Sequence, residues 1–461
     1  MQKPFDVCII GSGPAGIFSA IELAERYDII VLELGNKFSK RQRCKVVDND
    51  VSCNRCGGIC NIIAGFGGSF SSRSGGTLSL YPAGSSLIEY YDSKEDLLAD
   101  YEDAIKIWRK FSKDKMSFEG STNQEDITAF FRKVNEFGGI YKHYNGYKLD
   151  KASLDRTVQA MEDYITSKAR LEFNSEVISV VKKSNLWNVK CHNGKSYLSR
   201  AVVFATGRKG NSFISEKLKN MGVNQRKSEI DVGIRIEFAK DKIDYLAKLH
   251  PDMKIKFNIN GEEVRTFCFC PKGKIIHFNQ DSLCYNYIKI NFLEGYIDNE
   301  NLSDRTNISL LHRISFESAE EVFRFQRNFE EKYYSLGGRI IAQRLKDIGN
   351  TTFRPLPHNT TLKDYSIGSV FSLLPEKSVY ILLEAINRFD KILEGQVIDE
   401  NTVIAAPELG NFWPEIKMDK EFQTNISGIF VAGDALGFIR GALQGSVTGI
   451  KTSRAVMRFL D

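Results

Sequence analysis

The sequence predicts an α/β fold: a Rossmann-like nucleotide-binding domain assembled from discontinuous segments, a mixed α+β substrate or cap domain, and a helical insertion. Three observations near the start indicate the first domain. An apolar stretch over 5–10 ends in a glycine-rich turn, an amphipathic stretch over 15–26 follows, and an apolar stretch over 29–34 carries an acidic residue near its end. Strand, glycine turn, helix and strand at this spacing form a dinucleotide-binding unit.

The glycine-rich turn reads Gly11-Ser12-Gly13-Pro14-Ala15-Gly16. Its glycines allow a tight turn and let backbone N–H groups approach a pyrophosphate, which then rests at the positive end of the following helix. Glu33 lies where a carboxylate accepts hydrogen bonds from ribose hydroxyls, and Leu34 and Gly35 follow it. The sequence therefore predicts a bound nucleotide at this turn rather than a chance glycine turn.

A segment near the C-terminus indicates which nucleotide is bound. Residues 428–434 read Gly-Ile-Phe-Val-Ala-Gly-Asp, and Gly441-Ala442-Leu443 opens the last predicted helix. This pattern resembles the C-terminal signature of FAD enzymes of the glutathione-reductase superfamily. The resemblance implies that Asp434 binds the ribityl chain and that the helix N-terminus faces the flavin pyrimidine ring, where it would stabilise the negative charge of a reduced flavin.

The stretch over 201–208 reads Ala-Val-Val-Phe-Ala-Thr-Gly-Arg and matches the Ala-Thr-Gly strand end of the same superfamily. Three motifs in this order favour FAD over NAD as the bound cofactor. The remaining residues that we expect at the cofactor are Gly68, Val177, Ala205, Thr206, Gly207 and Gly433.

Composition restricts the class of protein. The 461 residues are enough for two or three domains with real cores, and 42% hydrophobic and 26% charged residues are globular values. No apolar run approaches the ~20 residues that span a bilayer, and the first predicted strand leaves no room for a signal peptide, so we expect a cytoplasmic protein without a membrane partner. A net charge of +5 gives no argument for a nucleic-acid partner.

The nucleotide-binding domain is predicted to come from residues 1–80, 171–220 and 401–461. A mainly helical insertion is expected over 81–170, because Ser-Lys-Glu-Asp at 93–96 is typical of a helix start and apolar residues then recur at helical spacing. The substrate or cap domain is expected over 221–400. That region mixes strand-like stretches (232–238, 264–269, 285–292) with helical ones (318–334, 377–389).

Four of the nine cysteines lie within seventeen residues, at Cys44, Cys53, Cys56 and Cys60. In a cytosolic chain such clustering indicates metal or redox chemistry more than structural disulfides. Four thiolates would hold Zn²⁺ or an iron–sulfur cluster, and the spacing does not choose between them. A dithiol that exchanges electrons with the flavin and a set of unligated thiols are the alternatives.

A basic run overlaps the start of this cysteine segment (Lys37, Lys40, Arg41, Arg43, Lys45). Its positive charge would lower the pKa of the neighbouring thiols, or it would bind the cofactor phosphates or an acidic electron donor. The alternative is a solvated surface. Two glycine-rich stretches follow, over 64–70 and 74–78. We interpret them as backbone packed against an isoalloxazine ring, with a flexible loop as the alternative.

Nearly the whole chain resembles one family, the bacterial and archaeal FAD-dependent dehydrogenases that are also labelled NAD(FAD)-utilising dehydrogenases. The resemblance rests on residues 11–16, 65–78, 231–237 with 265–273, and 428–449. Its most specific element is Phe-Cys-x-Cys-Pro-x-Gly, which the superfamily at large lacks. Where the family commonly reads Ser-Asp-Gly-Lys-Leu and Cys-Pro-Gly-Gly, this chain has Ser-Gly-Gly-Thr-Leu at 74–78 and Cys-Pro-Lys-Gly at 270–273, so substrate chemistry is expected to differ.

The resemblance implies an FAD-dependent oxidoreductase that acts on a small-molecule substrate, with electrons passing through the flavin. Cys268 and Cys270 are the candidate catalytic groups, as proton donor or redox pair, because alternate residues of a strand face the same side. The alternative is that both are small buried apolar residues. No second GxGxxG motif is evident, so we expect electrons from a partner protein or through the cysteine cluster.

Two other functions stay open. A flavin-dependent tRNA-modifying enzyme shares the N-terminal loop and the C-terminal glycine helix, but it requires a large basic face that the near-neutral net charge does not suggest. A non-catalytic redox sensor or electron-transfer subunit would use FAD and the cysteines to report redox state to a partner.

Overall fold

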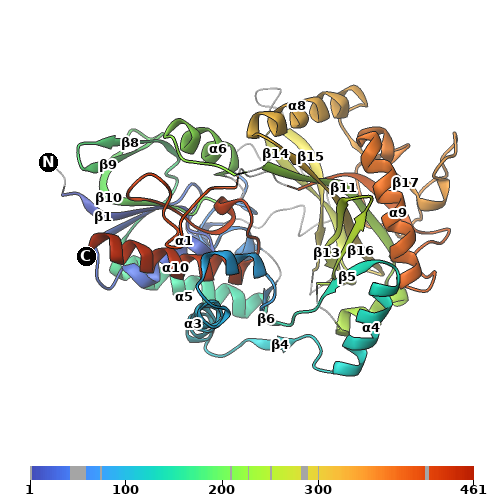
Figure 1. Ribbon diagram of the computed structural model, residues 1–461, viewed down its shortest axis with the longest axis horizontal. Coiled ribbons are helices and arrows are strands. Elements are labelled where there is room, and N and C mark those ends of the chain that lie inside the picture. Colours follow the sequence, from blue (N-terminus) through green and yellow to red (C-terminus); the bar gives the residue numbers. More distant parts are fainter. Residues whose placement is uncertain are drawn as a thin grey trace.

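The computed structural model describes residues 3–41, 59–72, 75–207, 210–226, 228–249, 252–281, 289–298, 301–410 and 415–461. Two bodies lie side by side, each built on its own β-sheet (Figure 1). The first has a sheet of parallel strands with two antiparallel strands at one edge, covered by helices, and the second has a large, mainly antiparallel sheet. The predicted α/β fold with a Rossmann-like domain and a mixed second domain is confirmed.

The sheet of the first body has the order β7-β2-β1-β10-β9-β8, and β20 pairs with the second half of β10. Its central strands are near-continuous apolar runs, as expected for parallel strands covered on both faces. The strands are β1 (Phe5–Ile10), β2 (Ile29–Leu32), β7 (Arg170–Glu172), β8 (Val177–Lys183), β9 (Leu186–Cys191), β10 (Ser196–Phe204) and β20 (Ile429–Val431).

The register of the parallel strands brings the sequence motifs together. Ile10 lies opposite Leu32 and Phe204, and Phe204 lies opposite Val431. These four residues end β1, β2, β10 and β20, so the segments that follow them meet at one edge of the sheet. In open parallel sheets this carboxyl edge is where ligands bind.

The helices of the first body are α1 (Pro14–Leu23), α3 (Lys94–Ser112), α5 (Lys151–Lys168), α6 (Asn211–Asn220) and α10 (Ala442–Leu460). Helices α1 and α10 pack closely against each other. A Cβ atom added to Gly449 would lie 2.4 Å from the carbonyl oxygen of Ala15, and Ser19 Oγ donates to the Gly449 carbonyl at 3.1 Å. A three-stranded sheet of β3 (Gly75–Ser79), β6 (Gly146–Asp150) and β4 (Ser117–Glu119) completes this body.

The second body is an eight-stranded sheet in the order β18-β17-β19-β11-β16-β13-β12-β5. Its longest pairing joins β11 and β16 in antiparallel register from Ser228 to Ala239. The strands are β5 (Gly139–Lys142), β11 (Ser228–Ala239), β12 (Lys254–Ile259), β13 (Glu262–Cys270), β16 (Arg305–Phe316), β17 (Ile340–Arg344), β18 (Tyr365–Ile367) and β19 (Val403–Leu409).

Helices cover this second sheet. Figure 1 shows α9 along its outer face and α8 at one end. The helices are α4 (Gln124–Glu136), α7 (Asp244–Leu249), α8 (Ala319–Ser335) and α9 (Glu376–Ile392), and a separate pair of strands is formed by β14 (Lys274–Asp281) and β15 (Lys289–Tyr296). Part of the strand expected over 285–292 falls outside the described residues.

The boundaries between the bodies differ from the expected ones. The helical insertion expected over 81–170 is divided: α3 and α5 pack in the first core, whereas α4 and β5 pack in the second. The strand β19 lies beside β11 in the second sheet, although the expected boundary placed residues after 400 in the nucleotide-binding domain. Both the division of residues 81–170 and the place of β19 depend on pairing between strands that are far apart in the sequence. Local sequence patterns do not reveal such pairing.

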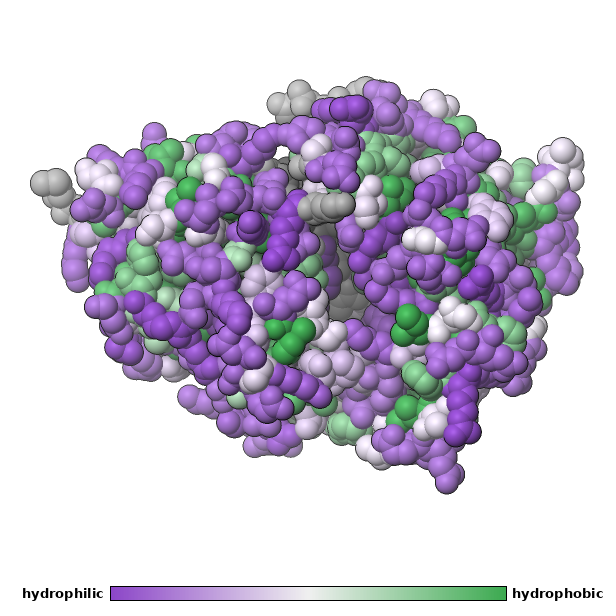
Figure 2. All heavy atoms as spheres, viewed as in Figure 1, coloured by the Kyte–Doolittle hydropathy of each residue, from purple (hydrophilic) through white to green (hydrophobic). Residues whose placement is uncertain are grey.

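No helix among the described residues is long and apolar enough to cross a membrane. On the face seen in Figure 2 most exposed side chains are hydrophilic, and hydrophobic ones are scattered.

Candidate functional site

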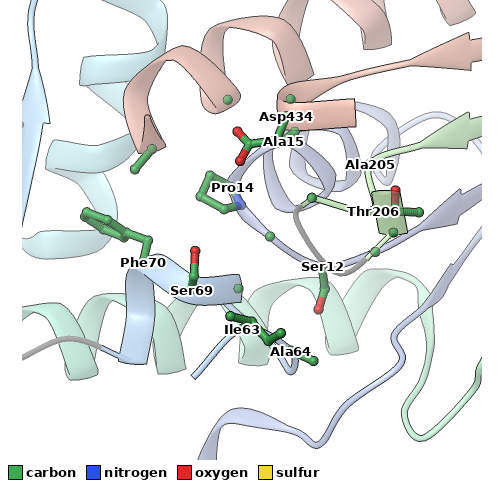
Figure 3. A pocket seen from close by; sticks show the side chains of 18 of the residues that line it. Ser12, Pro14, Ala15, Ile63, Ala64, Ser69, Phe70, Ala205, Thr206 and Asp434 are labelled. Carbon is green, nitrogen blue, oxygen red and sulfur yellow. The ribbon is translucent and has the colours of Figure 1, made fainter. Parts of the chain in front are cut away.

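A cavity of about 550 Å³ opens at the carboxyl edge of the first sheet. Its wall combines the turn after β1, the ends of β2 and β10, the segment after β20 and the start of α10. Tyr144 and Asp252 line it as well. Figure 3 shows Ser12, Pro14 and Thr206 around the pocket, with Asp434 on one side and Ile63 and Ala64 on the other.

The turn after β1 has the backbone that its glycines predict. Gly11 has φ +104°, and a Cβ atom there would lie 2.4 Å from the Ala205 carbonyl oxygen. A Cβ atom at Gly16 would lie 2.0 Å from the Gly11 carbonyl oxygen, so this glycine allows the helix to pack against the turn. Gly13 differs, because a Cβ atom there would meet nothing within 4 Å. The open space beside Gly13 is on the cavity wall.

Three helices begin at this cavity without a side-chain cap. The N-cap residues of α1, α6 and α10 are Gly13, Gly210 and Gly441, and all three line the cavity. Helices α3, α4, α5 and α8 are capped by side chains (Ser93, Asn123, Asp150, Ser318), whereas α9 begins after Pro375, outside the cavity lining, without such a cap. The first backbone N–H groups of a helix have no partner within the helix and carry its positive end. The glycine N-caps therefore leave three positive helix ends for an anionic or electron-rich ligand.

Glu33 is buried at the edge of the cavity and accepts four hydrogen bonds. One oxygen accepts from the Ser12 backbone N–H at 2.9 Å and the Ser12 hydroxyl at 2.7 Å. The other accepts from the backbone N–H groups of Gly35 and Gly65, both at 2.8 Å. The carboxylate thus holds the glycine turn, β2 and the 64–70 segment together.

The ends of β10 and β20 add polar groups to the wall. Thr206 Oγ1 is buried and has no hydrogen-bond partner among the described residues. Asp434 stands in the first turn after β20, in the short 3₁₀ helix Gly433–Leu436. The Gly433 backbone N–H donates to Thr448 Oγ1 at 3.0 Å, which fixes this turn against α10. A buried hydroxyl without a partner is what a bound ligand would satisfy.

Arg41 organises the first glycine-rich stretch from inside. Its guanidinium donates to the carbonyl oxygens of Phe66 and Gly68, both at 2.8 Å, and contacts Asn61 and Ser71. Burial lowers the pKa of Arg41 to about 10, although nearby Glu33 acts in the opposite direction. Arg41 is therefore a structural member of the basic run rather than part of a solvated surface. Arg43 and Lys45 lie outside the described residues.

Most of the residues predicted at the cofactor line this cavity. They are Gly11, Ser12, Gly13, Pro14, Ala15, Glu33, Leu34, Gly68, Val177, Ala205, Thr206, Gly207, Gly433, Asp434, Gly441 and Ala442. Gly16, Gly35 and Leu443 do not line it. Gly35 packs its backbone against Gly65, where a Cβ atom would lie 2.5 Å from the Gly65 nitrogen, and Leu443 is fully buried in the core.

The sequence reasoning missed the contribution of the second body. Tyr144 follows β5 and Asp252 precedes β12, and the Tyr144 hydroxyl donates to the Asp252 backbone carbonyl at 3.2 Å. Burial and the Asp252 carboxylate both raise the pKa of Tyr144. Arg440, just before α10, also lines the cavity. Arg440 stands beside a recognised motif, whereas no local pattern signals Tyr144 or Asp252.

Of the four predicted metal ligands, only Cys60 is among the described residues. Cys44, Cys53 and Cys56 lie outside the described residues, and Cys60 is half-buried. Within the described ranges no group of three or more His, Cys, Asp or Glu side chains could hold a metal ion. A zinc or iron–sulfur site at the four-cysteine segment stays a prediction.

The two candidate catalytic cysteines do not line the cavity. Cys268 and Cys270 lie on β13 of the second body, and their sulfur atoms are 3.7 Å apart. The backbone N–H of Phe269, between them, donates to the cavity-lining Asp252 carboxylate at 3.1 Å. The pair is thus attached to the cavity wall through one residue.

One family model matches part of this chain. Residues 229–409, from β11 to β19, match the family model described as FAD-dependent protein, C-terminal domain-like. An uncharacterized protein from Clostridium beijerinckii (strain ATCC 51743 / NCIMB 8052) is 23% identical over 323 residues, which cover 63% of this chain and 58% of that protein. The resemblance to FAD-dependent proteins is therefore supported over that part of the chain.

Solved structures with a similar arrangement are distant. Glycine oxidase from Geobacillus kaustophilus is 13% identical with a TM-score of 0.40, and the match covers 99% of this chain and 95% of that one. The halogenase PltM in complex with FAD is 12% identical with a TM-score of 0.40, covering 100% of this chain and 70% of that one.

Proposed function

We propose that this protein binds FAD in the cavity and is an FAD-dependent oxidoreductase for a small-molecule substrate. The observation that carries the proposal is the convergence of three glycine-capped helix N-termini on one cavity that Glu33 and Asp434 also line. The family match over residues 229–409 supports it independently.

The residues present fit FAD. The positive end of α1 and the open space beside Gly13 suit a pyrophosphate, and Glu33 suits the adenosine ribose. Asp434 and Thr206 provide an acceptor and a hydroxyl for the polar chain between pyrophosphate and flavin. The positive end of α10 would stabilise negative charge on the ring system. When bound, FAD supplies two-electron redox chemistry.

The protein's own residues would hold the cofactor in position and shield it from solvent. Phe70 and the 64–70 backbone line one side of the cavity, and Arg41 fixes that backbone. Tyr144 and Asp252 add groups from the second body to the cavity wall. The Tyr144 hydroxyl is protonated at neutral pH, as in any ordinary tyrosine, and burial and the Asp252 carboxylate raise its pKa further. The proposed electron source remains a partner protein or the four-cysteine segment.

Anaerobic purification followed by absorption spectroscopy tests this function. We expect about one FAD per chain after acid release, and full bleaching of the flavin bands by about two electrons per chain. Reoxidation that is faster with a small organic acceptor than with oxygen would identify substrate turnover. A chain that retains no flavin, and takes up none when FAD is added, would contradict the proposal.

A further inference from the structure

The two cysteines of β13 are brought together by an irregularity in the strand. Ser309 of β16 lies opposite Phe267 of β13, and Asn307 lies opposite Cys270. Three residues of β13 are therefore paired with a length of two residues on β16, which is a β-bulge. In a regular strand alternate residues stand about 6.6 Å apart along the chain. Here the bulge brings the two sulfur atoms to 3.7 Å. Bulges re-aim side chains and concentrate near functional sites.

The backbone at this bulge is held in an uncommon conformation. Cys268 has φ +48°, in the left-handed region that residues with a Cβ atom rarely occupy. The unusual backbone and the short sulfur–sulfur distance therefore occur at the same residue. Residues held in such strained backbone conformations cluster at functional sites.

A buried cation lies beside the pair. The guanidinium of Arg235 on β11 is fully buried and donates through Nη1 to the Cys268 carbonyl oxygen at 3.3 Å. Burial would lower the pKa of Arg235, but the Glu408 carboxylate, at 2.5 and 2.8 Å, raises it, so the group stays charged. The Glu408 carboxylate compensates this charge, so the part of Arg235 at the pair is to hold the Cys268 carbonyl oxygen, and with it the bulge, in place.

Glycine keeps this space open. A Cβ atom at Gly295 on β15 would lie 2.3 Å from Arg235 Nη1 and 2.6 Å from Cys270 Sγ. The backbone of β15 thus approaches both the cation and the buried thiol closely, and any larger residue would displace them. The cysteines, the arginine and the glycine form one compact cluster on three strands.

The two thiols differ in access. Cys268 is half-buried, whereas Cys270 is 3% exposed. Neither is in a disulfide in this structure. An accessible thiol with a buried partner within contact distance is the arrangement in which one thiol attacks and the other resolves the product.

We propose that Cys268 and Cys270 form a thiol–disulfide exchange site for organic disulfides. The Cys268 thiolate attacks one sulfur of RS–SR, the S–S bond breaks, and the leaving thiolate takes up the proton that Cys268 has lost. Cys270 then attacks the mixed disulfide, releases the second RSH and completes the Cys268–Cys270 disulfide. Two electrons and two protons pass from the pair to the organic disulfide. This reaction is complete without the flavin.

The experiment exploits the position of the pair between two trypsin sites. Cleavage after Arg265 and Lys272 releases Thr-Phe-Cys-Phe-Cys-Pro-Lys, which contains both cysteines and no other. The folded full-length protein is treated with bis(2-hydroxyethyl) disulfide, alkylated and digested. We expect this peptide to escape alkylation and to be about 2 Da lighter than the reduced peptide, with and without added FAD, because the disulfide has replaced two thiol hydrogens.

Two serine variants test the order of attack. Cys270→Ser should accumulate the mixed disulfide on Cys268, whereas Cys268→Ser should react about tenfold more slowly, because the remaining thiol is buried. Cys191→Ser, which removes a buried thiol of the first body, should behave like the wild type. Full alkylation of both thiols in the treated wild type, while urea-unfolded protein forms the disulfide, would overturn the proposal. Equal adduct formation by the two serine variants would overturn the assigned roles.

Discussion

At the scale of single residues, Glu33 shows how one side chain organises a site. Its carboxylate accepts three backbone N–H groups and one hydroxyl from three segments of the first body. The sequence predicted Glu33 at the cavity from its place at the end of a strand. The sequence did not predict that Ser12, Gly35 and Gly65 all donate hydrogen bonds to this carboxylate, because those bonds depend on how three separate segments pack against one another.

Replacing Glu33 with glutamine tests this role. The amide nitrogen cannot accept a hydrogen bond, so it would leave buried donors unpaired. We expect Glu33→Gln to lower the free energy of unfolding of the flavin-free protein by about 2 kcal/mol. Urea denaturation followed by circular dichroism measures it. Glu95→Gln, at an exposed position in α3, is the control and should change stability little.

Asp231 makes a buried, pH-dependent contact in the second sheet. It pairs with Arg265 on β13 and with Arg313 Nε on β16 at 3.1 Å. Arg313 also contacts Glu229 and Glu263, both at 3.3 Å. Burial alone would raise the pKa of Asp231, but the two guanidinium groups lower it to about 2. Since the folded pKa lies below the unfolded one, the contact stabilises the fold above about pH 4 and is lost toward pH 2.

We expect Asp231→Asn to reduce the free energy of unfolding by about 2 kcal/mol at pH 7. Between pH 5 and pH 3 the wild type should lose about 1 kcal/mol more than the variant, because only the wild type must protonate this carboxylate. Urea titrations at the two pH values give the difference. Asp241→Asn, at an exposed position, should follow the wild type. Parallel pH curves for wild type and Asp231→Asn would contradict the assignment.

At the scale of elements, most helices and strands follow from local patterns. The helix expected after Ser93 is α3, where the Ser93 hydroxyl accepts from the Asp96 backbone N–H at 3.1 Å. The alternating and apolar stretches around 232–238 and 264–269 are β11 and β13. The bulge at Cys268 was not predicted. Strand periodicity alone implied a regular alternation, and the bulge arises from pairing with β16.

The packing of α1 on α10 gives a prediction with a control in the same helix. A Cβ atom at Gly449 would lie 2.4 Å from the Ala15 carbonyl oxygen, but one at Gly445 would meet nothing closer than 3.6 Å. We expect Gly449→Ala to destabilise the protein by about 2 kcal/mol through overpacking. Gly445→Ala should be neutral or stabilising by up to about 1 kcal/mol, because alanine favours helix. Thermal unfolding of both variants compares them, and equal effects would contradict the tight contact.

At the scale of the whole molecule, the site arises where two bodies meet. The three motifs spread over 11–16, 201–208 and 428–449 were predictable as one site, since parallel strands align their carboxyl ends. The division of residues 81–170 between the bodies was not predictable. The short strand β5 pairs with β12 across more than one hundred residues, and that pairing places Tyr144 at the cavity.

Titration of flavin-free protein with FAD tests the central claim most directly. We compare the wild type with Gly13→Leu, whose side chain would enter the open space beside α1. Asn123→Leu is the control, because it alters the N-cap of α4 in the second body. We predict one FAD per wild-type and control chain, and an affinity reduced about 100-fold in Gly13→Leu with a retained fold, equivalent to about 2.7 kcal/mol. Equal affinity in all three proteins, or no binding to the wild type, would contradict the account.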